Sequence, residues 1–248
     1  MRVTVIGCSG SFPGPDSPAS CYLFEAGGFS LLLDFGNGAL GALQRHHGLY
    51  DVDAILISHL HADHCMDLCG YYVARKYCPQ GTQPKIPVYG PAGADVRMAE
   101  AYDLDLVPGM TDTFDFTPLS REFQVGPFHV VTEPVNHVIE SYGFRITCEG
   151  GTVAYSGDTG RTDVLVDLAR DADLFLCEAS FLEGPDLPPN LHLTAREAAE
   201  YADLAGVKKL VLTHLVPWND AERSLNEAKA AGFNGPIELA WSGATYDL

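Results

Sequence analysis

A histidine-rich segment that directly follows an apolar run constrains the fold of this chain more than any other feature. The run at residues 54–58 is typical of a buried strand, and His59, His61, Asp63 and His64 come immediately after it. Burying four such groups together is unfavourable unless a cation or hydrogen bonds replace the lost water. In an extended or turning segment, His59 and His61 point the same way because side chains alternate. The segment therefore predicts a metal site at the end of a strand.

The length and composition of the chain favour a single domain without a membrane span. The chain has 248 residues, of which 46% are hydrophobic, and we expect one domain over residues 1–248. It has no run of about 18 apolar residues, and its N-terminus lacks the pattern of a signal peptide. Its seven cysteines have no framework spacing, which fits free thiols in a reducing compartment. We therefore expect a cytoplasmic protein that does not bind membranes.

The charge of the chain disfavours long polyanions as partners. The formal net charge is −18 at pH 7, whereas proteins that bind nucleic acids usually carry basic patches. A small anionic substrate remains compatible with this charge, because a metal centre dominates the field around itself. We therefore expect a small-molecule substrate and no long nucleic acid among the partners.

Alternating apolar segments predict a layered α/β architecture. We expect strands at residues 3–6, 21–25, 30–34, 54–58, 86–89, 129–135, 143–148, 152–156, 174–178, 209–213 and 237–241. We expect helices at residues 38–46, 66–77, 92–101, 162–169, 194–205 and 221–231. Thr194 and Glu197 form a capping-box pattern at the start of the fifth of these helices. The early part is rich in strands and the later part alternates strand with helix, which favours mixed sheets covered by helices.

Three further residues of metal-binding type stand at the ends of expected strands. They are His137, Asp158 and His214, and loops at strand ends are where binding groups concentrate. The histidine-rich segment offers two ligands to each of two metals, and each metal is then two ligands short. These three remote residues supply what is missing, with Asp158 able to bridge the metals through its two oxygens.

Other histidines and cysteines have simpler interpretations. We expect His46, His47 and His129 to be ordinary structural or surface residues. Cys65 and Cys69 lie one helical turn apart, which would suit a metal pair. Free cysteine often packs as a small hydrophobic residue, however, and we expect core packing for both.

The order of these motifs resembles that of a known family. The segment SHLHADH is similar to the HxHxDH signature of the metallo-β-lactamase superfamily. The later elements NH at residues 136–137, GDT at 157–159 and TH at 213–214 occur in that superfamily's order and extend the resemblance over nearly the whole chain. The resemblance implies an αββα sandwich, with two mixed β-sheets covered by helices and a two-metal site at one edge.

The resemblance also implies how the ligands are divided. One metal would be bound by His59, His61, His137 and Asp158. The other would be bound by Asp63, His64, Asp158 and His214. Ligands of the His and carboxylate type without Cys suit Zn²⁺, which we favour, and also Mn²⁺ or Fe.

A second pattern resembles the ribonuclease Z branch of this superfamily. CEASF at residues 177–181 is followed, after a Pro-rich loop, by LHLTAREAAEYA. In that branch a Glu at a strand end supports a His that faces the scissile phosphate, and the corresponding residues here are Glu178 and His192. A carboxylate orients the imidazole and keeps it protonated. We therefore expect catalytic roles for Glu178 and His192, and also for Asp63; the alternative is that His192 is only a capping or surface residue.

Two other elements are expected to border the site. The stretch GCSGSFPGPDSPASCYLFEAGG, from Gly7, looks like the opening loop and second strand of the same branch. Its glycine spacing is not that of a P-loop, so we expect a turn that forms one lip of the cleft. Asp34 stands at a strand end, and we expect it to hydrogen-bond the metal-binding loop.

Two departures from ribonuclease Z argue against tRNA processing. That enzyme grips tRNA with a protruding arm inserted between its third metal motif and its GDT motif. Here only residues 138–157 separate His137 from Asp158, and two expected strands account for them. The sequence LVPWND follows His214, without the Arg and Tyr that usually follow in ribonuclease Z.

The sequence thus predicts a binuclear metal-dependent phosphodiesterase that hydrolyses a small cyclic phosphodiester. We favour a cyclic nucleotide, either 3′,5′-cyclic AMP or a 2′,3′-cyclic nucleotide, because compact members of this branch act on such substrates. The alternatives are an arylsulfatase or other ester hydrolase, a tRNA 3′-processing endonuclease, and a metal-binding accessory protein without turnover. Phe12, Tyr71 and Trp218 are candidates for stacking on a base, or else for packing in the core or at the rim. A homodimer is expected by resemblance alone.

Overall fold

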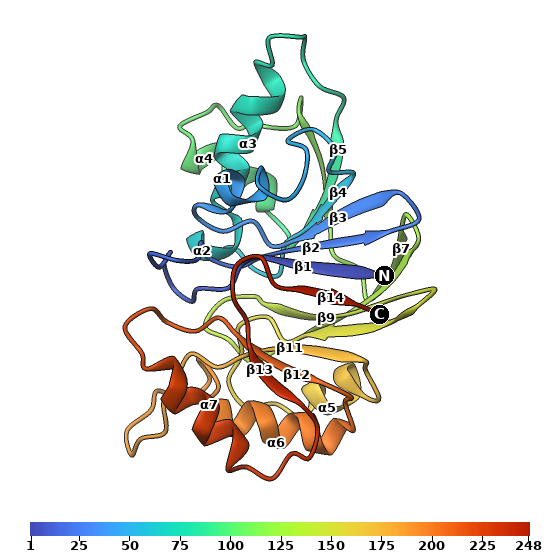
Figure 1. The fold of residues 1–248 in the computed structure, drawn as a ribbon. Helices are drawn as coiled ribbons and strands as arrows, with labels where there is room; N and C mark the ends of the chain where they lie inside the picture. The colour runs from blue at the N-terminus through green and yellow to red at the C-terminus, as the bar shows by residue number, and fades with distance from the viewer.

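The chain folds into two seven-stranded β-sheets that pack face to face (Figure 1). The computed structural model describes residues 1–248. The strand order is β14-β1-β2-β3-β4-β5-β6 in the first sheet and β13-β12-β11-β10-β9-β8-β7 in the second. The strands are β1 (Arg2–Gly7), β2 (Cys21–Ala26), β3 (Phe29–Leu33), β4 (Ala54–Leu56), β5 (Ile86–Gly90), β6 (Phe114–Pro118), β7 (Glu122–Val125), β8 (Phe128–Pro134), β9 (Tyr142–Cys148), β10 (Gly151–Tyr155), β11 (Leu174–Glu178), β12 (Leu210–Thr213), β13 (Ile237–Leu239) and β14 (Thr245–Asp247).

Each sheet is half antiparallel and half parallel. In the first sheet β14, β1, β2 and β3 pair antiparallel, and β3, β4, β5 and β6 pair parallel. In the second sheet β7 to β10 pair antiparallel, and β10 to β13 pair parallel. Parallel neighbours need crossover connections, and every helix of the chain lies in one of these crossovers. The carboxyl ends of the parallel strands in each sheet therefore lie along the same edge.

The helices cover the outer faces of the two sheets (Figure 1). The first sheet carries α1 (Ala39–Leu43), α2 (Ala62–Cys65), α3 (Asp67–Lys76) and α4 (Ala94–Ala101), and the second carries α5 (Val164–Ala169), α6 (Ala195–Ala205) and α7 (Ala221–Lys229). One buried cluster fills the space between the sheets, and another lies under each helical layer. The predicted αββα sandwich is confirmed. None of these helices has the length and apolar character that a membrane-crossing segment needs.

Most predicted elements are present, with small differences at their ends, but three strands and one helix were not predicted. The missed strands β6, β7 and β14 all stand at sheet edges, where one side of the strand faces solvent. Their sequences FDFTP, EFQV and TYD are short and contain at most two apolar residues each, which is too few to identify a strand from its pattern. The missed helix α2 has four residues and lies inside the histidine-rich segment. The capping box at Thr194 is confirmed.

Candidate metal centre

Loops from both sheets meet at one edge of the sandwich and carry the predicted metal ligands. The loop after β4 and the short helix α2 bring in residues 59–64 from the first sheet. Loops after β8, β10 and β12 bring in His137, Asp158 and His214 from the second sheet. The structure brings all seven predicted ligands together in two adjoining clusters.

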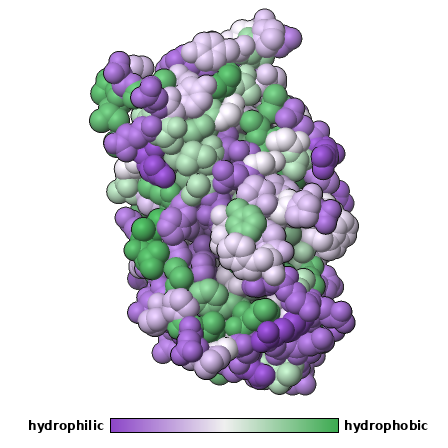
Figure 2. Space-filling view, turned by 90° about the vertical axis from the view of Figure 1, so that its left-hand side faces the viewer, coloured by the Kyte–Doolittle hydropathy of each residue, from purple (hydrophilic) through white to green (hydrophobic).

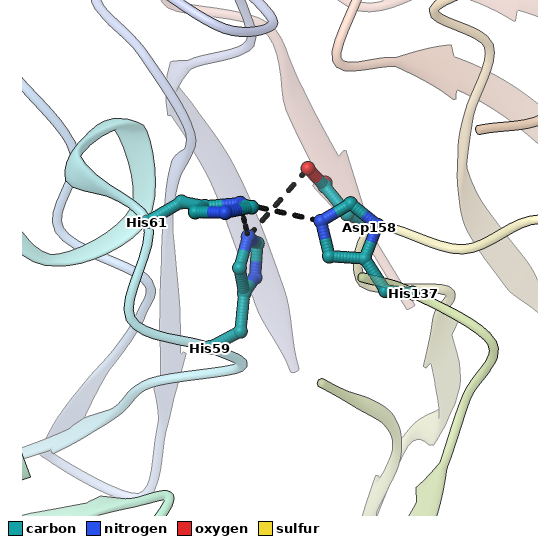
Figure 3. A group of neighbouring side chains, drawn as sticks. All are labelled: His59, His61, His137 and Asp158. Carbon is teal, nitrogen blue, oxygen red and sulfur yellow. Dashed lines mark hydrogen bonds and ion pairs between the residues drawn. The ribbon is translucent and has the colours of Figure 1, made fainter. Parts of the chain in front are cut away.

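The first cluster consists of His59, His61, His137 and Asp158, whose side chains point toward one another (Figure 3). His61 Nδ1 lies 3.1 Å from His59 Nε2 and 3.2 Å from His137 Nε2. Asp158 Oδ2 lies 3.6 Å from His59 Nε2. Ligand atoms around a tetrahedral ion with bonds of about 2.0–2.1 Å are ~3.3 Å apart. The spacing in this cluster is therefore close to that of a metal site.

The second cluster consists of Asp63, His64, Asp158 and His214, and all four residues are buried. His214 Nε2 lies 3.1 Å from His64 Nε2 and 3.0 Å from Asp63 Oδ2. Asp158 Oδ1 lies 3.2 Å from His64 Nε2, and Asp158 Oδ2 lies 3.3 Å from His214 Nε2. Asp158 therefore borders both clusters, as a bridging carboxylate must.

One buried oxygen shows that this set of residues fits a cation. Asp158 is only 2% exposed, and although its Oδ1 lies 3.2 Å from His64 Nε2, the two atoms form no hydrogen bond and Oδ1 has no other partner. A buried carboxylate oxygen without a partner is unfavourable, and a divalent cation between the clusters would satisfy it. Imidazole nitrogens and carboxylate oxygens are ligands that Zn²⁺ and Mn²⁺ accept. The clusters are thus suited to binding divalent metal ions, and the assignment of individual ligands stays a prediction.

Burial and neighbouring charges set the protonation of these groups. Burial lowers the pKa of His59, His61 and His137 below the usual range, which favours the neutral imidazole that binds metals. Burial alone would raise the pKa values of Asp63 and Asp158, but the adjacent histidines outweigh it and hold both pKa values well below the usual range. Both aspartates are therefore carboxylates at neutral pH.

The buried side chain of Asp34 organises the loop that carries the histidines. Asp34 accepts hydrogen bonds from the Ser58 backbone N–H at 2.7 Å and the Ser58 hydroxyl at 2.9 Å, and from His64 Nδ1 at 2.7 Å. The Tyr155 hydroxyl donates a further bond at 2.8 Å. The bond to Nδ1 turns His64 Nε2 toward the second cluster. The prediction that Asp34 hydrogen-bonds the metal-binding loop is confirmed.

Two further contacts orient histidines and were not predicted from the sequence. His137 Nδ1 donates to the Leu191 carbonyl oxygen at 2.9 Å, and His214 Nδ1 lies 2.7 Å from the Ser180 hydroxyl. Both contacts leave Nε2 facing the clusters. Leu191 acts through its backbone, so its side chain gives no signal. Ser180 lies in the CEASF motif, but nothing in the motif alone indicates a histidine partner.

The predicted Glu178–His192 pair forms beside the clusters. Glu178 Oε1 lies 2.9 Å from His192 Nδ1 and accepts a bond from the Thr159 N–H at 2.7 Å. Burial lowers the pKa of His192, but the charge and hydrogen bond of Glu178 outweigh this effect and raise the pKa to about 9. The His192 ring centre lies 5.4 Å from that of His137 and 5.5 Å from that of His214. His192 is thus held between the clusters, and the interpretation as a capping or surface residue is wrong.

The opening loop lies against the second cluster. The Ser11 N–H donates to Asp63 Oδ2 at 2.8 Å, and the Gly10 N–H donates to the Leu215 carbonyl at 3.0 Å. A Cβ at Gly10 would come within 2.4 Å of the His214 carbonyl oxygen, so a larger residue would push the loop away. The loop therefore forms one border of the site, as expected.

The aromatic candidates for base stacking differ in their positions. Tyr71 is fully buried against Phe35, with ring centres 5.4 Å apart, so a base-stacking role for Tyr71 is wrong. Phe12 and Trp218 pack against each other with ring centres 4.9 Å apart, and Trp218 is 74% exposed. A stacking role for this pair stays a prediction.

The other polar residues have the simpler roles that were expected. Cys65 and Cys69 are buried in the helical layer on the first sheet and belong to neither cluster. His47 lies 3.7 Å from Glu25, and His129 bonds to Glu122 at 2.8 Å, and neither histidine belongs to a cluster.

Comparisons with known proteins agree with this architecture. A family model described as the β-lactamase superfamily domain matches residues 30–215. An uncharacterized protein of Mycobacterium leprae, ML1173, is 47% identical over 255 residues, which cover all of this chain and 89% of that protein. A ribonuclease Z of Mycobacterium bovis is 30% identical over 266 residues, which cover 96% of this chain and 95% of the enzyme.

A solved structure extends the comparison to three dimensions. The probable metallo-hydrolase YhfI of Bacillus subtilis is 32% identical over 250 residues, which cover both chains completely. Its crystal structure superposes with a TM-score of 0.88 over 100% of this chain and 99% of YhfI. The two-sheet fold, the paired His and Asp clusters, the family model and these relatives agree, and the chain belongs to the β-lactamase superfamily.

Proposed function

We propose that the protein is a phosphodiesterase that hydrolyses a small cyclic phosphodiester with the help of two divalent ions. The favoured substrate is 3′,5′-cyclic AMP, and 2′,3′-cyclic nucleotides come next. The observation that carries the proposal is the placement of His192 between the two clusters with its Nδ1 bound to Glu178. A hydrolase that relied on its metals alone would have no need of a carboxylate–imidazole pair at this position.

The two clusters would hold the ions, with Asp158 shared between them, and Zn²⁺ is the favoured metal. Two divalent ions held in this way would supply Lewis acidity toward the ester and activate water as a nucleophile. Asp63 would orient the attacking water, because its carboxylate is fixed by the Ser11 N–H and faces the second cluster.

His192 would donate a proton from Nε2 to the leaving oxygen of the ester. Its Nδ1–H is committed to Glu178, which is itself fully buried and held by the Thr159 N–H. That carboxylate stabilises the protonated imidazole and fixes the direction of Nε2. Likeness to a ribonuclease also supports phosphodiester chemistry.

The proposal that the substrate is small rests on the shape and charge of the chain. Residues 138–157 hold only a short loop and the antiparallel strands β9 and β10, so no arm for gripping tRNA protrudes there. With a net charge of −18, the surface also repels a long polyanion.

The proposal is tested by a turnover screen of protein loaded with Zn²⁺ or Mn²⁺. The substrates are 3′,5′-cyclic AMP, 2′,3′-cyclic AMP, an aryl phosphodiester, an aryl sulfate and a precursor tRNA. We expect the cyclic nucleotides to be hydrolysed far faster than the precursor tRNA at equal metal loading. Efficient cleavage at a tRNA 3′ end would restore the endonuclease alternative, and turnover of the aryl sulfate alone would establish the sulfatase alternative.

A further inference from the structure

A cavity of about 360 Å³ opens beside the first cluster. Three chain segments that are distant in sequence form it: the loop after β4, the start of α4 with the loop before it, and the loop after His137. It is lined by Leu60, His61, Pro91, Ala92, Arg97, Ile139 and Glu140. Figure 2 shows the molecule from the side of α2, where hydrophilic and apolar patches lie next to each other. Because His61 both lines the cavity and belongs to the first cluster, a ligand that contacts this cluster has room to extend into the cavity.

Arg97 is an unpaired cation on the cavity wall. Ten of the 15 lysines and arginines form ion pairs, which is expected in a chain this acidic. The Arg97 guanidinium has neither an ion-pair nor a hydrogen-bond partner, although Glu140 lines the same cavity. Its donors are therefore available to a ligand.

Glu140 provides an acceptor in the same cavity. Its Oε1 accepts the Tyr142 hydroxyl at 2.6 Å, which positions the carboxylate and leaves Oε2 for another donor. Glu140 and Arg97 are not within ion-pair distance of each other, so a ligand that fits between them must present an acceptor to one and a donor to the other.

The remaining walls are apolar. The apolar lining consists of Leu60, Pro91, Ala92 and Ile139, and Ile139 is 38% exposed. A planar heterocycle with an amino group beside a ring nitrogen matches both the walls and the two charges. Adenine presents the ring nitrogen N1 as an acceptor beside the 6-amino donor, whereas hypoxanthine presents the reverse order, with an N1–H donor beside the O6 acceptor.

We propose that this cavity binds the adenine base of the substrate, with Arg97 donating to a ring nitrogen and Glu140 accepting from the 6-amino group. The inference rests on the proposed function, because it places a nucleotide's phosphate at the clusters and its base beyond His61. It makes Arg97 and Glu140 residues that determine specificity, without a part in the chemical step.

The first test measures binding by calorimetry on the Zn²⁺-loaded protein, with 5′-AMP and inorganic phosphate as separate probes. Arg97→Ala should weaken AMP binding roughly 10- to 100-fold, the range for loss of hydrogen bonds to a charged group, and should change phosphate binding far less. Arg45→Ala removes another exposed arginine, at the end of α1 and outside the cavity, and should change neither affinity. Unchanged AMP binding by Arg97→Ala, or an equal loss for both probes, would overturn the inference.

The second test replaces the base. Wild-type protein should bind AMP roughly 10-fold more tightly than IMP, and Glu140→Gln should remove most of that preference because an amide offers a donor as well as an acceptor. Equal binding of AMP and IMP by the wild type would contradict the role of Glu140. Turnover of an aryl phosphodiester by the wild type separates the two proposals. If the wild type hydrolyses the aryl phosphodiester while Arg97→Ala binds AMP with normal affinity, only the inference about the cavity fails. If the wild type hydrolyses no phosphodiester, the proposed function fails.

Discussion

The two clusters share Asp158 but differ in how firmly the chain holds them. In the second cluster, His64 is held by Asp34, His214 by Ser180 and Asp63 by the Ser11 N–H, and all three are buried. In the first cluster His61 and His137 are only partly buried. The Leu191 carbonyl oxygen holds His137, but the His61 imidazole makes hydrogen-bonding contacts only within the cluster.

This difference would let one metal centre combine tight binding of an ion with access for the substrate. A ligand that is already oriented loses little freedom when an ion binds, so the second cluster should bind its ion more tightly. The first cluster adjoins the cavity at His61 and should be the side on which substrate and product exchange. Four predictions test this comparison.

The largest effect is expected for the residue that the clusters share. Asp158→Ala should lose both ions together and abolish turnover, because each cluster loses a ligand and the site loses a negative charge that balances the charge of the two cations. Elemental analysis of the metal content per chain checks this prediction. Asp158→Asn keeps the shape of the side chain and serves as a control for loss of metal through misfolding. A variant that keeps one ion at full affinity would show that Asp158 serves a single cluster.

A large effect on turnover without loss of metal is expected for His192, which lies between the clusters without joining either set of proposed ligands. His192→Ala should lower kcat roughly 10²–10⁴-fold, the range for loss of a general acid, and Glu178→Gln should show a weaker version of the defect. Metal content should stay at the wild-type level in both variants.

The leaving group distinguishes the possible roles of His192. An aryl phosphodiester with a good leaving group should be much less sensitive to His192→Ala, because its leaving oxygen does not need a proton. Equal losses on both substrates would instead assign His192 to phosphate positioning.

A smaller effect is expected for Asp34, whose only direct hydrogen bond to a proposed ligand is the one to His64 of the second cluster. Asp34→Asn should weaken binding of one ion about 10- to 100-fold, because it disturbs the orientation and basicity of His64. Titration with a competing chelator should then resolve one weakened site and one unchanged site. Asp53→Asn is the matched control, since Asp53 also accepts a backbone N–H, from Ser30 at 2.8 Å, but lies outside the clusters. Equal weakening of both ions would contradict the division between the clusters.

The smallest effect is expected for a single hydroxyl that supports Asp34. Tyr155→Phe should lower the free energy of unfolding by about 1 kcal/mol, the usual net contribution of a hydrogen bond, with a slight loss of affinity at the second cluster. Tyr22→Phe is a close control because Tyr22 packs on Tyr155 at 5.2 Å and bonds Thr213 instead of Asp34. Tyr22→Phe should show a similar change in the free energy of unfolding, measured with denaturant, and no change in metal affinity. A matching loss of affinity in Tyr22→Phe would mean that general packing is responsible.

Local patterns in the chain were enough to predict the layers of the fold and the types of residue at the site. Apolar runs gave the interior strands and their crossover helices, and the polar residues that follow those runs were predicted to meet at one edge. These predictions succeed because the sequence patterns of strands and helices are local, and because parallel strands place their carboxyl ends along the same edge of a sheet. Edge strands such as Phe114–Pro118 escaped prediction because they bury too little surface to require an apolar pattern.

The way in which those residues are held, and what lies beside them, depends on contacts between segments that are distant in sequence. The contact of Ser180 with His214, the Leu191 carbonyl that orients His137, and the core position of Tyr71 each depend on packing between distant segments. The cavity that contains Arg97 is likewise formed by three loops that approach one another only when the strands are in register. Such contacts carry no local pattern, since a backbone carbonyl or an unpaired guanidinium acquires its role from its neighbours in space.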